Sequence, residues 1–472
     1  MLYDSPMESE KLIAIIKERA PSINQVILEL INEHDTRQME DGVKYYFNKN
    51  DIRKHQQYYY DSNGNKVIDK DKVNNKIPHG WHKLLVDQKV SYLVGKPITF
   101  NTEDKVFEEK INLYLGEDWD DTASELVKNA SNKGKEYLHP YIDEEGNFNY
   151  VIIPAEQIIP IYKNSLKKEI VSVIRYYMIG DVMKVELWDE TTVTYYEKVG
   201  GELVVDINYE NNPESHFRYG IEGQEGNYGW GKVPFIEFRN NEEAISDLSF
   251  YKDLIDEYDK TVSGMANNLE EIQSLIYVLK GYDGANLAEF MENLRHFKAI
   301  KVSEDGGIDT LETNVPVASV DSHLDRTEDC LFTFGMGVNT NTDKMGNAPS
   351  GVSLRFLYSS LDMKANMQER KFKKALELFM WFLAEYLRIK EKENHDYKSV
   401  SFVFNKTMIM NESEQVDIAQ KSSGIIPQEI ILANHPWVHD VEAAKKMLEE
   451  EKSAYQIDLD EVDVDEQSGQ VE

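Results

Sequence analysis

The chain has 472 residues, more than one hydrophobic core usually serves, so two or three packed regions are expected. Its 52 basic and 85 acidic residues give a net charge of -33, which argues against a sequence-specific nucleic-acid binder. The single cysteine, Cys330, excludes an internal disulfide framework and is typical of a chain that folds in a reducing cytosol. The N-terminus has no secretory signal pattern, and the most apolar helical stretch, 376–387, is short and interrupted by Glu377 and Glu385. We therefore expect neither export nor a membrane span.

The first 135 residues have a mainly helical pattern. The stretch 78–97 shows it best, because Val86, Val90 and Leu93 recur on one helical face and Gly95 follows where the pattern stops. This part of the chain is therefore predicted to consist mostly of helices.

Between about Tyr137 and Phe238 the hydrophobic period changes to two. Runs of β-branched and aromatic residues alternate there with short turn-forming pairs. The clearest runs are 169–179, 182–190, 191–199 and 202–210. The pattern predicts consecutive antiparallel strands, so the fold class is α+β, with a β-rich module inside a helical frame.

A long helix is predicted after the strands, because apolar residues recur alternately three and four positions apart. They form one seam along a helix of roughly 50 Å, and the seam residues are Leu248, Tyr251, Ile255, Tyr258, Val262, Met265, Leu269, Ile272 and Ile276. Such a seam is typical of a coiled-coil hairpin within one chain. The other face is expected to be acidic where it meets water, since it carries Asp247, Asp253, Asp256, Glu257, Glu270 and Glu271.

A small insert is expected between Gly281 and Val317. Residues 285–298 have a helical pattern, and two strand-like runs after them are joined by the turn Glu304–Gly307. The insert therefore resembles a self-contained tip.

Two more helices are predicted beyond the insert, at about 319–335 and 350–392. The second begins after Pro349 with the capping hydroxyl of Ser350. The loop between the two helices consists of turn formers and small polar residues, with no evident ligand to bind.

Shorter helical patterns close the chain at 411–424, 427–436 and 440–452. The tail after Tyr455 is dense in carboxylates and is expected to be disordered.

Motifs that invite an enzymatic interpretation each lack a necessary group. Residues 346–351 have glycines at phosphate-loop spacing, but Val352 stands where a lysine would contact the phosphates. No serine lies in a G-x-S-x-G elbow, and Cys330 has no activating neighbours in the sequence. The sequence therefore predicts no catalytic residue and no cofactor.

Two histidine pairs have spacings that could touch one metal ion. His79 and His82 lie three residues apart at the start of a predicted helix, without a third ligand nearby. His435 and His439 are spaced i, i+4 but lack the glutamate of a zinc-protease helix. Surface or helix-capping roles suit these side chains better, so no metal site is expected.

Several stretches together resemble the portal protein of tailed bacteriophages of the siphovirus type. In their order and spacing, the stretches that carry this resemblance are 45–52, 74–100, 229–259, 337–365 and 411–451. Each is moderately specific alone, but together they cover nearly the whole chain.

The resemblance implies a homo-oligomeric ring, usually of twelve subunits, at one vertex of the capsid. A terminase motor, through its large subunit, drives double-stranded DNA inward through such a ring, and the DNA contact is non-specific. The implied partners also include the scaffolding protein, the major capsid protein, and the head-completion or adaptor proteins that dock later with the tail. The implied location is the virion, after assembly in the host cytoplasm.

The resemblance also implies a division of the chain into the regions of a portal fold. They are a helical and β-rich wing (1–240), a stem helix (241–272), a small α/β clip (273–316), a second stem helix (317–336), a tunnel loop (337–349), a long wing helix (350–398), a helical crown (399–455) and an acidic flexible tail (456–472).

Three sets of site residues follow from this division. Stem residues expected to pack between subunits are Leu248, Ile255, Tyr258, Val262, Met265 and Leu269. Clip residues expected to dock partners are Glu304, Asp305, Gly306 and Gly307. Tunnel-loop residues expected to meet DNA in the channel are Asn339, Thr340, Asn341, Asp343, Lys344, Met345 and Asn347. A negative channel would repel DNA phosphates, so the duplex would slide without being captured.

Two other classes of function remain open on the sequence alone. A non-portal structural or adaptor protein of the virion would share the composition and the apolar seam, and the polar loop and clip-like insert argue against it. An acidic ATP-dependent enzyme is disfavoured by the missing lysine at Val352.

Overall fold

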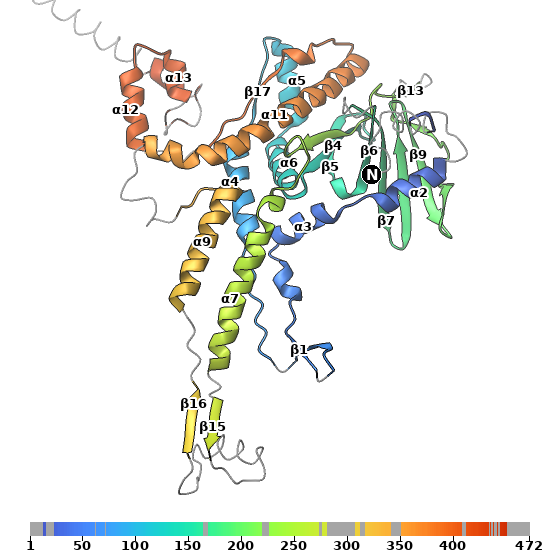
Figure 1. Ribbon diagram of the computed structural model, residues 1–472. Helices are drawn as coiled ribbons and strands as arrows, with labels where there is room; N and C mark the ends of the chain where they lie inside the picture. The colour runs from blue at the N-terminus through green and yellow to red at the C-terminus, as the bar shows by residue number, and fades with distance from the viewer. Residues whose placement is uncertain are drawn as a thin grey trace, which may run out of the picture. The chain divides into compact units, whose positions relative to one another are not determined.

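The computed structural model (Figure 1) forms two compact units, Met1–Gly337 with Ser360–Thr407, and Val338–Ser359 with Met408–Glu472. The residues that it describes are 13–15, 23–61, 63–70, 72–163, 169–219, 226–272, 276–280, 307–311, 317–340, 351–407, 412–433, 435, 438, 441 and 444–450. None of the helices in these ranges is both long and apolar enough to cross a membrane.

The larger unit contains an antiparallel sheet with the strand order β10-β9-β8-β7-β6, and β11 pairs with β9 at its side. Its strands are β6 (Ile158–Tyr162), β7 (Ile170–Ile179), β8 (Val182–Trp188), β9 (Thr192–Val199), β10 (Glu202–Val205) and β11 (Glu214–Ser215). The prediction of consecutive antiparallel strands is therefore confirmed. Helix α2 (Ile23–Glu33) covers one face, because Ile23, Ile27 and Ile31 share one side of the helix and pack on the apolar side of the sheet.

A second sheet has the order β14-β4-β5 and is covered by the long helix α11 (Gly351–Lys390). Its strands are β4 (Lys135–Ile142), β5 (Phe148–Ile153) and β14 (Ile236–Arg239). The packing is aromatic: the ring centroid of Phe379 on α11 lies 5.3 Å from that of Trp119 and 5.8 Å from that of Phe148. The predicted helix 350–392 is thus confirmed, and its apolar centre is core.

Further helices and small sheets complete this unit. The helices are α3 (Arg37–Tyr46), α4 (Trp81–Val94), α5 (Lys105–Leu115), α6 (Trp119–Lys133) and the 3-10 turns η1 (Asp51–Lys54), η2 (Ala155–Gln157), η3 (Asp247–Phe250) and η4 (Tyr397–Ser399). The two-stranded sheets are β1 (Tyr58–Tyr60) with β2 (Lys66–Ile68), β3 (Thr99–Asn101) with β17 (Ser401–Val403), and β12 (Phe217–Tyr219) with β13 (Gly226–Tyr228).

The helix that follows the strands is shorter than the seam predicted. Helix α7 spans Lys252–Ile272, about 32 Å, whereas Leu248 lies in η3. Strand β15 (Ile276–Lys280) pairs antiparallel with β16 (Gly307–Leu311). The prediction that Ile276 continues the helix is therefore wrong, because the apolar, β-branched run at 276–278 favours a strand. Gly307, expected in a turn, is paired with Lys280 in this ladder.

The helix predicted at about 319–335 is present as α9 (Val317–Gly335). In the smaller unit, α12 (Glu412–Ser422) and α13 (Gln428–Ala433) match the predicted helices at 411–424 and 427–436, and residues 444–450 are also helical. The tail after Tyr455 lies outside the described residues.

The His82 side chain lies in the first turn of α4 in the larger unit, and the residue is only 1% exposed. Its Nδ1 lies 2.8 Å from the hydroxyl of Tyr251, which is also buried. Burial lowers the pKa of His82 to about 4, because a charged imidazole would lose its hydration there. The expectation of a surface or capping histidine is therefore wrong for His82.

His82 should make the protein acid-sensitive between pH 6.5 and 4. In that window the unfolded imidazole binds a proton and the folded one does not, so stability is complete above pH 6.5 and falls as the pH drops toward 4. The slope from this group is about 1.4 kcal/mol per pH unit. Thermal unfolding of the variant His82→Gln should depend less on pH than that of the wild type, and His323→Gln, at a half-exposed site, is the control. Equal slopes for wild type and His82→Gln would contradict this account.

Candidate assembly and channel surfaces

One face of α7 binds an extended segment of its own chain, residues 74–79, which we call the strap. Asn267 Oδ1 accepts from Asn75 N at 2.6 Å, Ser263 Oγ from Ile77 N at 3.0 Å, and Asp259 Oδ1 from His79 N at 2.9 Å. Asp259 also accepts from the His79 Nδ1 and the Asn50 amide. These three α7 side chains are buried, so each α7 acceptor satisfies a strap N–H that water does not reach easily.

The strap and α7 can form successive hydrogen bonds because the spacing of alternate strap residues nearly equals the spacing of every fourth residue on the helix. Alternate residues of an extended chain are about 6.6 Å apart, and residues four apart on a helix are about 6.0 Å apart. Three successive pairs therefore stay in register as the two segments run in opposite directions. The apolar seam did not predict this, but polar residues at i, i+4 and i+8 (Asp259, Ser263 and Asn267) are the signal in the sequence that could have found it.

The face of α7 roughly 180° away from the strap packs on α9. Leu254 and Tyr258 join a cluster that includes Leu331 and Phe332 of α9, and the imidazole of His323 lies 3.5 Å from the Glu257 carboxylate. At 100° per residue, these α7 positions lie opposite the strap-facing ones. Helix α7 is therefore held between α9 and the strap.

The predicted stem-packing residues divide into two groups. Leu248 and Ile255 are buried within their own chain, in a cluster with Tyr45, Leu85, Tyr251 and Leu331. Farther along α7, Val262 and Met265 are half-buried and Leu269 is 53% exposed. At 100° per residue, these last three residues lie on the same side of α7 as Tyr258, so they continue the α9 face toward the C-terminal end of the helix, and we call them the apolar stripe.

A cluster of buried charged side chains connects η3, which precedes α7, with α4, α11 and the end of α9. The Asp247 carboxylate lies 2.7 Å from Lys89 Nζ on α4 and 2.9 Å from Lys364 Nζ on α11, and Lys364 Nζ also donates to the Gly335 carbonyl at the end of α9. Burial alone would raise the pKa of Asp247, but the two lysines outweigh it and hold the pKa well below its usual range. Asp247 was predicted on the wet face of a helix and is instead 3% exposed. Sequence spacing missed this cluster because its members are far apart along the chain.

The C-terminal end of α9 packs closely on α4. A Cβ on Gly335 would lie 2.6 Å from a Cδ atom of Leu85, and one on Gly337 would lie 2.3 Å from the other, so a larger residue at either position would have to displace the Leu85 side chain. The predicted tunnel loop begins there. Asn339 is half-buried and Thr340 is exposed, and the remaining tunnel-loop residues lie outside the described residues: Asn341, Asp343, Lys344, Met345 and Asn347.

Most of the predicted clip residues lie outside the part of the chain that the structure describes. Glu304, Asp305 and Gly306 lie outside the described residues, and Gly307 is known only as the first residue of β16. The phosphate-loop-like stretch 346–350 also lies outside them.

His79 and His82 have separate partners, and the pair His435 and His439 is not tested by the described residues. His79 is bonded to Asp259 and His82 to Tyr251, and His439 is not among the described residues. No group of three or more His, Cys, Asp or Glu side chains in the described ranges is arranged to hold a metal ion.

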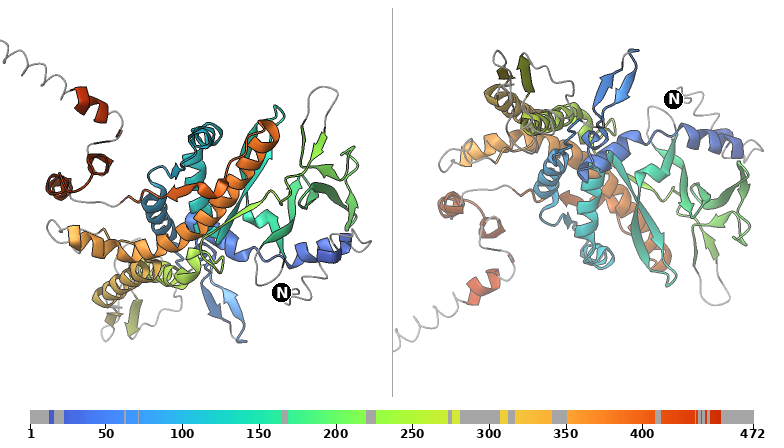
Figure 2. Two further views of the ribbon diagram at one scale, coloured as in Figure 1. Left: turned by 90° about the horizontal axis from the view of Figure 1, so that it is seen from above. Right: turned by 90° about the horizontal axis from the view of Figure 1, so that it is seen from below.

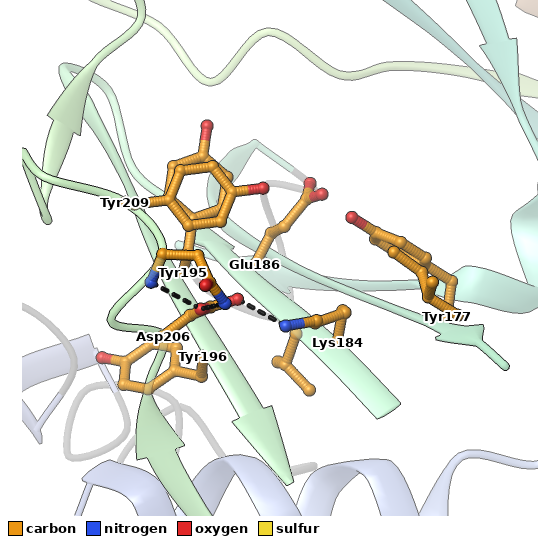
Figure 3. Close-up of a pocket in the computed structure, with 10 residues that line it drawn as sticks. Tyr177, Lys184, Glu186, Tyr195, Tyr196, Asp206 and Tyr209 are labelled. Atoms are coloured by element: carbon orange, nitrogen blue, oxygen red, sulfur yellow. Dashed lines mark hydrogen bonds and ion pairs between the residues drawn. The ribbon is translucent and has the colours of Figure 1, made fainter. Parts of the chain in front are cut away.

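A shallow pocket lies on the β7–β9 sheet, where Tyr195 and Tyr209 stack with their ring centroids 3.7 Å apart (Figure 3). Lys184 Nζ lies 2.8 Å from the Glu197 carboxylate and 2.7 Å from that of Asp206. Glu186 accepts from Trp188 Nε1 at 2.9 Å. The residues that line the pocket include no Ser, Cys or His.

Comparison with known protein families identifies the class of protein to which the chain belongs. The family model described as "Phage portal protein, SPP1 Gp6-like" matches residues 27–458. The chain therefore belongs to the phage portal protein family.

Its similarity to individual portal proteins extends over nearly the whole chain. It is 44% identical over 460 residues to the portal protein of Bacillus phage SPP1, covering 95% of this chain and 91% of that protein. It is 34% identical over 474 residues to the portal protein of Clostridium phage phiCD119, covering 94% and 96%. These relatives support the portal interpretation and not the alternative of a non-portal adaptor.

Two solved structures have weaker similarity at 10% sequence identity. The neck of a native GTA particle, computed with C12 symmetry, gives a TM-score of 0.42 and covers 75% of this chain and 89% of that chain. The neck of an empty GTA particle, computed with C6 symmetry, gives 0.44 and covers 73% and 86%.

Asp259 is the acceptor on which the strap depends most. The variant Asp259→Ala should destabilise the strap–helix contact by about 3 kcal/mol, because the amide of Asn50 and the N–H of His79 lose their acceptor in a buried place. Deuterium uptake by a peptide covering 74–80 should rise strongly. Asp253→Ala, at an exposed site on the same helix, should change stability by less than about 0.5 kcal/mol. Unchanged protection of the strap in Asp259→Ala would show that these bonds do not hold it.

Proposed function

We propose that copies of this chain assemble into a ring, of twelve subunits in the capsid, whose central channel passes double-stranded DNA. The observation that carries the proposal is the portal family match across residues 27–458. The packed pair α7–α9 supports it, because two long antiparallel helices with a partly unburied apolar stripe suit lateral packing of neighbouring subunits.

Within this ring, α7 and α9 form the stem that surrounds the channel. The wing corresponds to 1–240 with the long helix 350–398, the clip to 273–316, the tunnel loop to 337–349 and the crown to 399–455. The apolar stripe meets the helices of an adjacent subunit, and Leu248 and Ile255 hold the stem to the wing of their own chain.

The charge of the chain favours passage of DNA over its retention. A net charge of -33 per subunit makes any ring strongly negative, so phosphates are repelled and the duplex slides. On α9, the exposed carboxylates Asp321, Asp325 and Asp329 add to that field.

The loop between α9 and α11 contacts the moving duplex in this proposal. Its small polar residues offer weak contacts that do not depend on base sequence, and Lys344 is the cation able to reach a phosphate. The clip tip, Glu304 to Gly307, docks the terminase large subunit during packaging and head-completion proteins afterwards. The scaffolding and major capsid proteins surround the ring at the capsid vertex, after assembly in the host cytoplasm.

Native mass spectrometry of the purified full-length protein tests the ring directly. The expected result is a single high-mass oligomer, and a monomer or dimer under all solution conditions would rule the proposal out. Turnover of a nucleotide by the purified protein alone would instead favour an enzyme.

The apolar stripe gives a prediction about assembly. The variant Val262→Asp places a charge between packed helices of adjacent subunits, at a cost of several kcal/mol at each interface, so rings should fail to form. Asn268→Asp adds the same charge at an exposed position of α7 and is the matched control. Particles of wild-type mass from Val262→Asp would remove the stripe from the subunit interface.

The tunnel loop gives a prediction about packaging. Replacing Asn339–Asn347 by a short glycine linker should leave folding and ring formation intact, while DNA packaging falls sharply in an assay with terminase. Lys344→Ala should do less damage, because it removes one phosphate contact and keeps the loop. Normal packaging by rings with the shortened loop would falsify the proposed contact.

A further inference from the structure

The β1–β2 hairpin is an element that the sequence patterns did not predict and that the portal assignment leaves without a role. Its tyrosines are open to solvent: Tyr58 is 45%, Tyr59 49% and Tyr60 72% exposed, and Ile68 on the partner strand is 46% exposed. An isolated two-stranded hairpin is marginally stable in water. A partner that covers the tyrosines would therefore stabilise it.

The hairpin lies in a locally basic part of a very acidic chain. Residues 53–76, which we call the arm, contain six basic and three acidic residues. Lys66, Lys70 and Lys72 are exposed, and none of them forms an ion pair with a carboxylate of the described residues. The Lys66 ammonium instead lies 4.1 Å from the ring centroid of Tyr58. The arm therefore presents tyrosines and free ammonium groups, which suits a surface of carboxylates.

The chain presents such a surface on α9. Asp321, Asp325 and Asp329 are exposed and spaced four residues apart, so they line one side of the helix. Residues that pack toward the core of the unit, Thr327 and Leu331, lie on another side.

The arm and α9 lie on opposite sides of α7. The strap continues the arm and binds the α7 face of Asp259 and Ser263, whereas α9 packs on the face of Leu254 and Tyr258. Figure 1 and both views of Figure 2 also place α7 between α9 and the hairpin. A cyclic ring joins two different faces of one subunit in a head-to-tail contact. This arrangement allows the α9 side of one subunit to meet the arm side of the next.

We propose that the arm of each subunit docks on the acidic side of α9 in a second copy of this chain, so that Lys70 and Lys72 pair with its Asp321 and Asp325. The tyrosine hydroxyls then donate to carboxylates along the same helix, and the rings cover its apolar parts. This inference rests on the proposed ring and adds the surface that fixes neighbouring subunits.

A charge swap in the full-length protein tests the contact. Lys70→Glu/Lys72→Glu and, separately, Asp321→Lys/Asp325→Lys should each lower the fraction of protein in rings about tenfold or more, because like charges then face each other. The four substitutions together should restore most of the ring fraction. Lys96→Glu/Lys105→Glu reverses two exposed charges on the wing and should leave rings intact.

The outcomes separate this inference from the proposed function. Wild-type protein that forms no ring overturns both. Rings that form normally in either charge-reversed variant, or a fourfold variant that stays unassembled, overturn the docking surface while the ring itself stands. Normal rings that hold DNA less well after Lys70→Glu/Lys72→Glu would assign the arm to nucleic acid and also overturn it. Circular dichroism of each variant at the wild-type level shows that the chain still folds.

Discussion

The bonds between the strap and the polar face of α7 are the constraint on which the rest of this structure depends. Asp259, Ser263 and Asn267 take up backbone N–H groups that would otherwise be buried without partners. This use of polar side chains fixes the rotation of α7 about its own axis. Once the polar face is committed to the strap, α9 takes the opposite face, and the apolar stripe continues that face to Leu269, which is exposed.

Two further contacts carry that arrangement into the body of the molecule. Trp81 on α4 packs edge-on against Tyr258 of α7 and Phe332 of α9, at centroid distances of 5.4 and 5.6 Å. The Asp247 carboxylate forms ion pairs with Lys89 of α4 and Lys364 of α11. Lys364 also donates a hydrogen bond to the carbonyl of the last residue of α9. A buried carboxylate with two ammonium groups is costly to break, so the helix pair is held to the wing core at a defined place. In the ring that we propose, the wing and the stem would therefore move together.

Sequence patterns predicted the parts of this fold that local chemistry decides. The strands at 170–199 and the long helix from Gly351 agree with the prediction, because alternation and helical periodicity act within a few residues. The predicted helical seam was wrong beyond Ile272, since the spacing that suits a helix also occurs in the strand at 276–280. The strap bonds and the ion pairs of Asp247 join residues more than 100 positions apart, and no local pattern reports such pairs. The hairpin at 58–68 contains Asn63-Gly64, a turn sequence typical of β-hairpins, but the sequence patterns considered above did not include it. Most of the predicted tunnel-loop and clip residues lie outside the described residues and stay predictions.

A map of the assembled oligomer that resolves side chains tests the central claim most directly, namely that each α7 keeps its polar face for its own strap and offers its remaining surface to neighbours. The account predicts a ring in which Asp259 contacts His79 of the same chain in every subunit, with the strap and α9 on opposite lateral sides of α7 and the apolar stripe against an adjacent subunit. A map in which the strap is displaced and the polar face of α7 binds a neighbouring chain or lines the channel would contradict it.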